Sequence, residues 1–281
     1  MNTQLFEVST GANLGFARTS PIRATNHTAI VTGNRAMKGG TMKKLSLFLL
    51  GAAFTLCPVA TAQPQSTVYL GSAGSYAVLA GTTVTNTGLS VVNGNLGVWP
   101  GTAVTGFGPG IVNGTEDAGD VAAQHAQASL NIAYNDAAGR TSVNIVGLAG
   151  DLGGRTLTPG LYKSTSTLAI TGTLTLAGKG VYIFQIASGL TINTGSGVVL
   201  SGGASSADVF WQVGSSAALG TTADFKGTIL ALTSISLATG ATLDGRALAQ
   251  HGAVTLDTNN VTIPLGNAVL VQLPPPAPRR D

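Results

Sequence analysis

The sequence predicts an all-β fold with one long helix, built as a right-handed three-sided β-solenoid (β-helix) with the α-helix packed alongside. Three observations lead to this fold class: short apolar strands that recur at steps of roughly 20 residues, glycine-rich turns between them, and a single helical stretch. Of the 281 residues, 39 are glycine and only 9% are charged, whereas about a quarter are charged in a typical domain. The exposed sides of the strands are therefore expected to be polar through hydroxyl and amide groups.

The segment 1–62 is expected to precede the folded domain. Residues 1–41 show no apolar periodicity, and we interpret them as an upstream mis-start or a disordered leader. Residues 42–62 have the three parts of a signal peptide: basic Met42-Lys43-Lys44, the apolar run from Leu45 to Leu56, and the cleavage site Ala60-Thr61-Ala62 before Gln63. That run is shorter than the roughly 20 apolar residues of a spanning helix. We predict a secreted protein, extracellular or periplasmic, without membrane association after cleavage.

The charge of the predicted mature chain limits its partners, and its cysteine content limits its covalent cross-links. The formal charge is +5 over residues 1–62 and −2 over residues 63–281, so no basic patch remains for nucleic acid. The single cysteine, Cys57, precedes the expected cleavage site, so the mature chain folds without disulfides. We expect a monomer.

The predicted elements are a first group of strands, one helix, a second group of strands and a tail. Strand-like segments run from Thr67 to about Gly114, and a helix is predicted over about 116–139 because Thr115-Glu116-Asp117 supplies an acidic first turn and Gly139 a stop. Its apolar stripe is predicted to contain Val121, His125 or Ala128, Ile132 and Tyr134. Strands resume up to Pro264, which gives a solenoid domain over 63–273 and a proline-rich tail over 274–281.

The repeat is irregular but detectable when the apolar segments are aligned. The aligned positions are Leu161, Val181, Val209, Ile229 and Ala247, and the one long interval, from Val181 to Val209, contains a loop at Ser201-Gly202-Gly203-Ala204. Steps of roughly 20 residues with three short strands each are typical of a three-sided solenoid coil. A jelly-roll sandwich is the alternative, but it should not repeat at this period.

Each coil divides into three strands by its alternation. The first strand, as in Val181-Tyr182-Ile183-Phe184, is apolar on both sides, so the helix should pack against it. The second alternates, with Leu190 and Ile192 inward. The third points residues such as Leu200, Phe225, Leu243 and Ile263 inward and places Asp224, Lys226 and Asp244 outward.

The outward side of the second strands carries small and hydroxyl-bearing residues, with Asp257 as its one evident charge. These candidate binding residues are Thr83, Thr85, Ala103, Thr105, Thr167, Ala169, Thr171, Gly189, Thr191, Asn193, Ser216, Ala218, Ser234, Ser236, Ala238, Ala253 and Thr255.

Several sequence segments of the chain resemble those of the bacterial and fungal ice-binding (antifreeze) family with the DUF3494 domain. They are Tyr76-Ala77-Val78-Leu79-Ala80, Leu157-Thr158-Pro159-Gly160-Leu161-Tyr162, Val199-Leu200-Ser201-Gly202-Gly203-Ala204, Asp208-Val209-Phe210-Trp211-Gln212-Val213-Gly214 and Gly245-Arg246-Ala247-Leu248-Ala249. The resemblance covers roughly Thr67 to Pro264. It implies a right-handed β-helix whose coils are not stacked strictly in sequence order, and ice binding through one flat face.

The resemblance also implies a Thr-Ala/Gly-x-Thr/Asn pattern on that face. Four segments fit it, two of them with serine in place of threonine: Thr102-Ala103-Val104-Thr105, Thr239-Gly240-Ala241-Thr242, Ser188-Gly189-Leu190-Thr191 and Thr87-Gly88-Leu89-Ser90. The physical argument is independent: coils about 4.8 Å apart and outward side chains about 6.7 Å apart form a grid that can hold water near ice spacings. Threonine suits this use because its χ1 is stiff, so little entropy is lost on binding.

Other interpretations remain. Outward threonines can simply reflect β propensity. A pectinase-like enzyme would need clustered carboxylates, whereas Glu116 and the aspartates are dispersed along the mature chain. We therefore expect no enzyme, no cofactor and no metal site, since His125 and His251 stand apart. A cell-surface adhesin or carbohydrate-binding solenoid would expose aromatic rings, whereas Trp99, Trp211 and Phe225 stand in core-like alternation.

Overall fold

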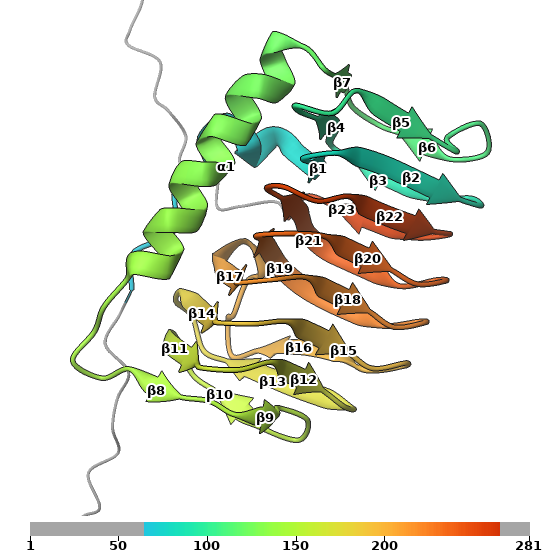
Figure 1. Cartoon of the computed structure of the whole chain (residues 1–281). Coiled ribbons are helices and arrows are strands. Elements are labelled where there is room, and N and C mark those ends of the chain that lie inside the picture. The colour runs from blue at the N-terminus through green and yellow to red at the C-terminus, as the bar shows by residue number, and fades with distance from the viewer. Residues whose placement is uncertain (1–64, 265–281) are drawn as a thin grey trace, which may run out of the picture. The chain divides into compact units, whose positions relative to one another are not determined.

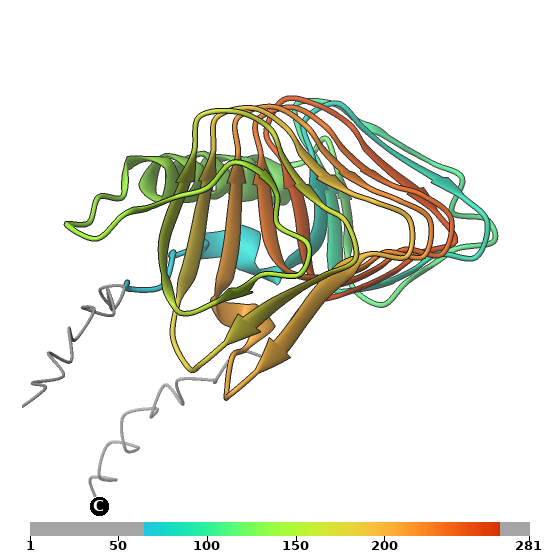
Figure 2. The ribbon, with the colours of Figure 1, turned by 90° about the horizontal axis from the view of Figure 1, so that it is seen from below.

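The computed structural model describes residues 65–264. These residues form a three-sided solenoid of parallel strands with a single α-helix along one side (Figures 1 and 2). The predicted leader (1–41), signal peptide (42–62) and proline-rich tail (274–281) lie outside the described residues. None of the helices within residues 65–264 combines the length and hydropathy that a membrane crossing requires.

The first of the three faces lies under the helix, and we call it the helix face. Its strands, in spatial order, are β8 (Val146–Gly147), β11 (Gly160–Ser164), β14 (Tyr182–Ile186), β17 (Val209–Val213), the second half of β19 (Asp224–Ala231), the second half of β21 (Thr242–Ala249), β1 (Tyr76–Ala80), β4 (Asn95–Val98) and β7 (Glu116–Ala118).

The second face is a separate eight-stranded parallel sheet, which we call the hydroxyl face. Its order is β5 (Ala103–Thr105), β2 (Thr83–Thr87), β22 (Val254–Asp257), β20 (Ile235–Leu237), β18 (Ala217–Leu219), β15 (Leu190–Ile192), β12 (Leu168–Ile170) and β9 (Gly150–Asp151).

The third face, the charged face, contains the first halves of β19 and β21. The other members are β10 (Thr156–Leu157), β13 (Thr173–Ala177), β16 (Gly197–Ser201), β23 (Asn260–Thr262), β3 (Val91–Asn93) and β6 (Ile111–Val112). The strands β19 and β21 turn the corner to the helix face at Gly227 and Gly245, which pair in register. A Cβ atom on Gly245 would lie 1.9 Å from the backbone oxygen of Gly227, so this corner requires glycine.

The coils are not stacked in sequence order. The last coil, which contains β22, is covered by the first, which contains β2, and β5 lies beyond it (Figure 1). The chain therefore builds two coils at one end, returns to the other end, and adds coils until the last one meets the first. The helix α1 (Val121–Gly139) makes this return: its 19 residues span about 28 Å, close to the height of six steps of about 4.8 Å.

The helix begins at Val121, later than the predicted start near 116. Glu116 and Asp117 belong to β7, and the helix start is capped by Asp120, whose side chain accepts a hydrogen bond from the backbone N–H of Ala123 at 2.8 Å. An aspartate serves equally well as an N-cap and as a first-turn residue, so the acidic run did not fix the boundary.

The predicted apolar stripe of the helix is also wrong, apart from Tyr134. Val121 and Ile132 are 63% and 68% exposed. The buried stripe consists instead of Ala123, Ala126, Leu130, Ala133, Tyr134 and Ala137. Alanine dominates because small side chains let the helix lie close to a sheet that is already apolar, in contact with residues such as Leu79, Ile183 and Leu248.

Three glutamines tie the helix to the solenoid. Nε2 of Gln185 donates to the carbonyl oxygens of Ala137, Ala138 and Arg140 at 2.8–3.1 Å, which satisfies carbonyls at the helix end. Gln212 donates to the hydroxyl of Tyr134, and Gln127 donates to the Ala249 carbonyl.

The two sides of the first strand divide as predicted. Tyr182, Phe184 and Ile186 lie in the solenoid interior, whereas Val181 and Ile183 join the cluster under the helix. Inside, the rings of Phe184 and Trp211 stack at a centroid distance of 3.8 Å, with Tyr162 and Phe225 at the two ends of the stack.

The predicted alignment of the first strands is wrong in three of four cases. Leu161 pairs with Ile183 rather than Val181, Val209 pairs with Tyr182, and Ile229 pairs with Trp211 rather than Val209. Only the predicted match of Ile229 with Ala247 is confirmed. A strand that is apolar on both faces carries no mark of which side is inward, so its pattern does not fix the register.

Candidate functional site

The hydroxyl face brings together all of the predicted binding residues. Each lies in, or directly beside, a strand of the eight-stranded sheet. Their neighbours in the strands, such as Val84, Leu190 and Ile235, are almost completely buried, whereas the predicted residues are exposed or half-exposed. The structure therefore orients these side chains outward, in agreement with the alternation of the sequence.

Pairing between the strands aligns one outward residue from each coil into a row, which we call the central row. Thr85 pairs with Thr105 on one side and with Thr255 on the other, and Ala218 pairs with Ser236 and Thr191. The full central row, in spatial order, is Thr105, Thr85, Thr255, Ser236, Ala218, Thr191, Ala169 and Asp151.

Flanking rows lie two residues earlier and two residues later along the same strands. The earlier row contains Thr83 and Ala103, which pair directly, together with Thr167, Gly189, Ser216, Ser234 and Ala253. The later row contains Thr171, Asn193 and Ala238. Parallel pairing keeps every row in register, so the side chains lie on a grid with steps of about 4.8 Å between coils.

Hydrogen bonds between neighbouring coils fix several of these side chains. Asn193 Nδ2 donates to the hydroxyl of Thr171 at 2.7 Å, and the hydroxyls of Ser216 and Thr233 lie 3.1 Å apart. A side chain that is held before binding loses less entropy when it orders a water or a ligand.

Two carboxylates, at the side and at one end of the sheet, limit the charge-free area of the hydroxyl face. Asp257 pairs with Thr87 at the side of the sheet and accepts a hydrogen bond from Thr239. Asp151, which the sequence reasoning missed, ends the central row. Hydrogen bonds from Thr171 and from the backbone of Gly153 lower the pKa of Asp151. The strand β9 has only two residues and no alternation, so nothing in the sequence marked Asp151 as part of this face.

Thr87 is a second residue that the predicted set omitted. It is the last residue of β2 and is exposed on the same face as Thr83 and Thr85. The alternation of threonine at 83, 85 and 87 is the pattern that would have included it.

Only two of the four pattern matches run along strands of the face. Thr102–Thr105 and Ser188–Thr191 lead into β5 and β15 with their second and fourth residues outward. In the other two, the glycines Gly88 and Gly240 have positive φ and form the turns that leave β2 and β20. A four-residue pattern of small residues therefore occurs both in strands and at corners, because both positions favour them.

The dispersed acids and histidines do not converge. Within residues 65–264, no three His, Cys, Asp or Glu side chains gather closely enough to hold a metal ion. On the charged face, Lys226 forms an ion pair with Asp224 at 2.7 Å. The hydroxyl face presents hydroxyl and methyl groups, backbone and few charges, an arrangement suited to ordering water.

Comparisons of the sequence and of the structure with known proteins both find ice-binding proteins. A family model described as "Ice-binding-like" matches residues 78–262. An ice-binding protein of Nostoc sp. (strain HG1) is 47% identical over 226 residues, which cover 78% of this chain and 82% of the relative. An ice-binding protein of Flavobacterium frigoris (strain PS1) is 40% identical over 217 residues, which cover 72% of this chain and 78% of the relative. The crystal structure of an ice-binding protein from an Antarctic biological consortium matches with a TM-score of 0.72 at 50% identity, covering 73% of this chain and 95% of that one.

Proposed function

The chain belongs to the Ice-binding-like family, and we propose that it adsorbs to ice through its hydroxyl face, giving thermal hysteresis and inhibition of ice recrystallisation. The observation that carries the choice of face is the central row, which runs without a charge from Thr105 to Ala169 across seven stacked strands.

The chemistry of this row suits ice better than it suits a soluble ligand. Each threonine offers a hydroxyl that can anchor one water and a methyl group that limits further hydration, on a β-branched side chain with few rotamers. A single contact of this kind is weak. Ice is an extended partner, however, so all contacts of a rigid grid form together and their effects combine.

The other two faces are less suitable. The helix covers the helix face, and the charged face carries Asp224, Lys226 and Asp244. Ionised groups orient water around themselves, which opposes a lattice set by ice. The family comparisons also favour ice binding over an adhesin or a carbohydrate-binding solenoid as the main function.

Substitution by tyrosine tests the assignment of the face. Thr191 and Ala218 lie side by side near the middle of the central row, and a ring at either position would hold ice away from the surrounding grid. We expect Thr191→Tyr and Ala218→Tyr to reduce thermal hysteresis severalfold, with stability changed by less than about 0.5 kcal/mol, as is usual for exposed sites.

The matched control is Val199→Tyr, because Val199 is 50% exposed and points outward from β16 on the charged face. It should retain the hysteresis of the parent. Loss of activity in the Val199 variant, with full activity in both hydroxyl-face variants, would move the ice-binding surface to the charged face.

We also propose that the protein acts outside the cytoplasm, as a non-enzymatic monomer without nucleic-acid or membrane partners. The signal-peptide pattern supports the location, and the absence of a basic patch in residues 63–281 supports the absence of a nucleic-acid partner. Secreted protein should begin at Gln63, and N-terminal sequencing checks this. Recovery of residues 1–41 on the secreted chain would contradict it.

A further inference from the structure

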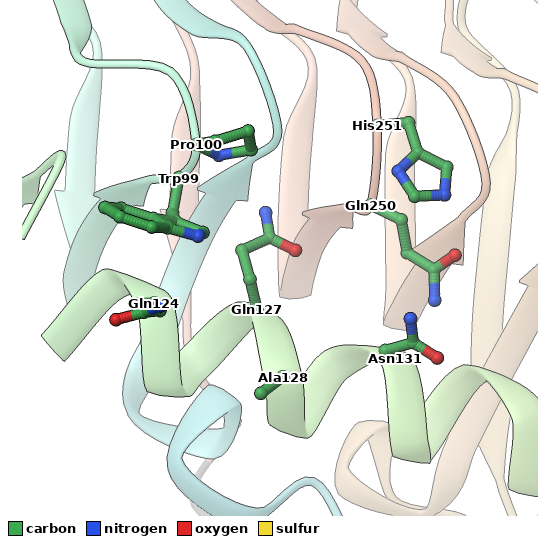
Figure 3. Close-up of a pocket in the computed structure, with 8 residues that line it drawn as sticks. All are labelled: Trp99, Pro100, Gln124, Gln127, Ala128, Asn131, Gln250 and His251. Carbon is green, nitrogen blue, oxygen red and sulfur yellow. The ribbon is translucent and has the colours of Figure 1, made fainter. Parts of the chain in front are cut away.

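A groove separate from the hydroxyl face opens where the helix passes the junction between the first and last coils. Its volume is about 330 Å³, at the low end of the roughly 300–1,000 Å³ of small-molecule sites. Residues from three segments line it: Trp99 and Pro100 after β4, Gln124, Gln127, Ala128 and Asn131 from α1, and Gln250 and His251 after β21 (Figure 3).

The groove contains a buried hydrogen-bond donor without a partner. Gln250 is only 7% exposed, and its Nε2 atom makes no hydrogen bond within the described residues. A buried amide donor left in this state is costly, because it has lost its water without gaining an acceptor. Figure 3 shows this nitrogen directed toward the amide of Asn131 across the groove.

The facing amide is also available as a donor. Asn131 Oδ1 accepts a hydrogen bond from Asn135 at 2.7 Å, which leaves its Nδ2 pointing at Gln250 (Figure 3). In this orientation, neither amide nitrogen has an acceptor, and because Nε2 of Gln250 is fully buried, a ligand oxygen can reach it only after a side-chain movement. A half-turn of the Gln250 amide would instead join the two side chains directly, and the groove would then need no ligand. The binding test below distinguishes these arrangements.

An aromatic surface completes the groove. Trp99 was predicted to be a core residue, but unlike Trp211 and Phe225 it is partly exposed, and its indole lines this groove (Figure 3). Its indole N–H finds no hydrogen-bond partner within residues 65–264. A tryptophan with one open side and a free N–H offers both an apolar surface and a donor to a ligand.

We propose that this groove binds a neutral, hydroxyl-rich small molecule of about the size of one sugar unit. Hydroxyl oxygens can accept from Gln250, Asn131 and Trp99, and hydroxyl hydrogens can donate to the amide oxygen of Gln127, whose Nε2 donates to the Ala249 carbonyl (Figure 3). The C–H side of the ligand lies against the indole. No Asp, Glu, Lys or Arg lines the groove, which disfavours anions and cations. The lining residues lie outside the central row and its flanking rows, so the site does not rest on the proposed ice-binding face.

The test measures binding directly. The chain has two tryptophans, and Trp211 is fully buried, so fluorescence changes on titration report mainly on Trp99. D-glucose, N-acetyl-D-glucosamine and the linear polyol sorbitol are titrated to about 10 mM, roughly ten times a 1 mM dissociation constant. Saturation-transfer NMR on the same samples provides an independent readout, and D-glucuronate tests for charge.

We expect at least one of the neutral probes to bind, with glucuronate weaker. Binding of a ring sugar without sorbitol identifies a ring as the ligand, and binding of both identifies a general polyol site. Asn131→Ala and Gln124→Ala, both at exposed helix positions, should weaken binding at least tenfold. His125→Ala is the control, since His125 is exposed on the same helix and does not line the groove.

Circular dichroism verifies that each variant is folded, and ice-recrystallisation inhibition should be unchanged in all three. The proposal is overturned if no neutral probe binds, if glucuronate alone binds, or if the Asn131 and Gln124 variants bind as well as the His125 variant.

Discussion

The aromatic side chains of the interior stack on one another from coil to coil. Trp211 is fully buried, lies against Phe184 at 3.8 Å and Phe225 at 5.0 Å, and donates from its indole nitrogen to the Lys226 carbonyl at 3.0 Å. Its ring therefore fills the interior across neighbouring coils and also satisfies a carbonyl at the corner of β19. A residue with both roles is difficult to replace.

Truncation of this ring should be among the most destabilising single changes. We expect Trp211→Ala to lower the free energy of unfolding by about 3–5 kcal/mol, because the large cavity cannot close between two fixed rings. Denaturant unfolding measures it. Ile132→Ala, at a residue that is 68% exposed, is the control and should change stability by less than about 0.5 kcal/mol. Equal midpoints for the two variants would contradict this account of the core.

At the scale of elements, the predicted helix starts too early, near 116 rather than at Val121, whereas its predicted end at Gly139 is confirmed. Its buried stripe is mostly alanine, so little of its attachment comes from large apolar side chains. Capping by Asp120 and the hydrogen bonds from Gln185 to the last carbonyls therefore carry more of its stability than they would in a leucine-rich helix.

The true start of the helix can be tested with two neighbouring acids. Asp120→Ala should lower the free energy of unfolding by about 1 kcal/mol, the usual cost of losing an N-cap. Glu116→Ala should have little effect, because Glu116 is exposed in β7 rather than in the first helical turn. Thermal unfolding of the two variants compares them. A larger loss for Glu116→Ala would place the helix start near 116 after all.

At the scale of the whole solenoid, the decisive contact joins the first coil to the last. The strands β1 and β2 of the first coil pair with β21 and β22 of the last, and this seam completes the central row between Thr85 and Thr255. At the seam, Gly81 lies so close to the last coil that a Cβ atom would be 2.4 Å from the Gln250 carbonyl oxygen.

A methyl group at this seam should separate the two coils. We expect Gly81→Ala to cost about 1–3 kcal/mol by overpacking and to reduce thermal hysteresis, since the face loses its continuity between β2 and β22. The control is Gly108→Ala, where nothing lies within 4 Å of the added carbon. Unfolding midpoint and hysteresis are measured together. Parent-like behaviour of the Gly81 variant would mean that the seam tolerates a shift.

Local alternation of apolar and polar residues is what allowed the sequence by itself to determine which strand residues point inward and which point outward. Wherever a strand is buried on one side only, the period of two separates inward from outward residues, and so the candidate binding residues from Thr83 to Thr255 could be placed on one face without coordinates. The single long helix and the short repeated strands of the solenoid followed from the same local patterns. The strands under the helix have no such contrast, and there three of the four predicted alignments were wrong.

Only the tertiary structure decided which coils are neighbours. The contact of β2 with β22 joins segments from opposite ends of the described chain, and no local preference encodes it. It depends on the helix carrying the chain back along the stack, and on the last coil finding the first as its partner. The same long-range packing placed Asp151 at the end of the central row and left Trp99 open in a groove. Burial depends on what a segment packs against, and a local pattern does not contain that information.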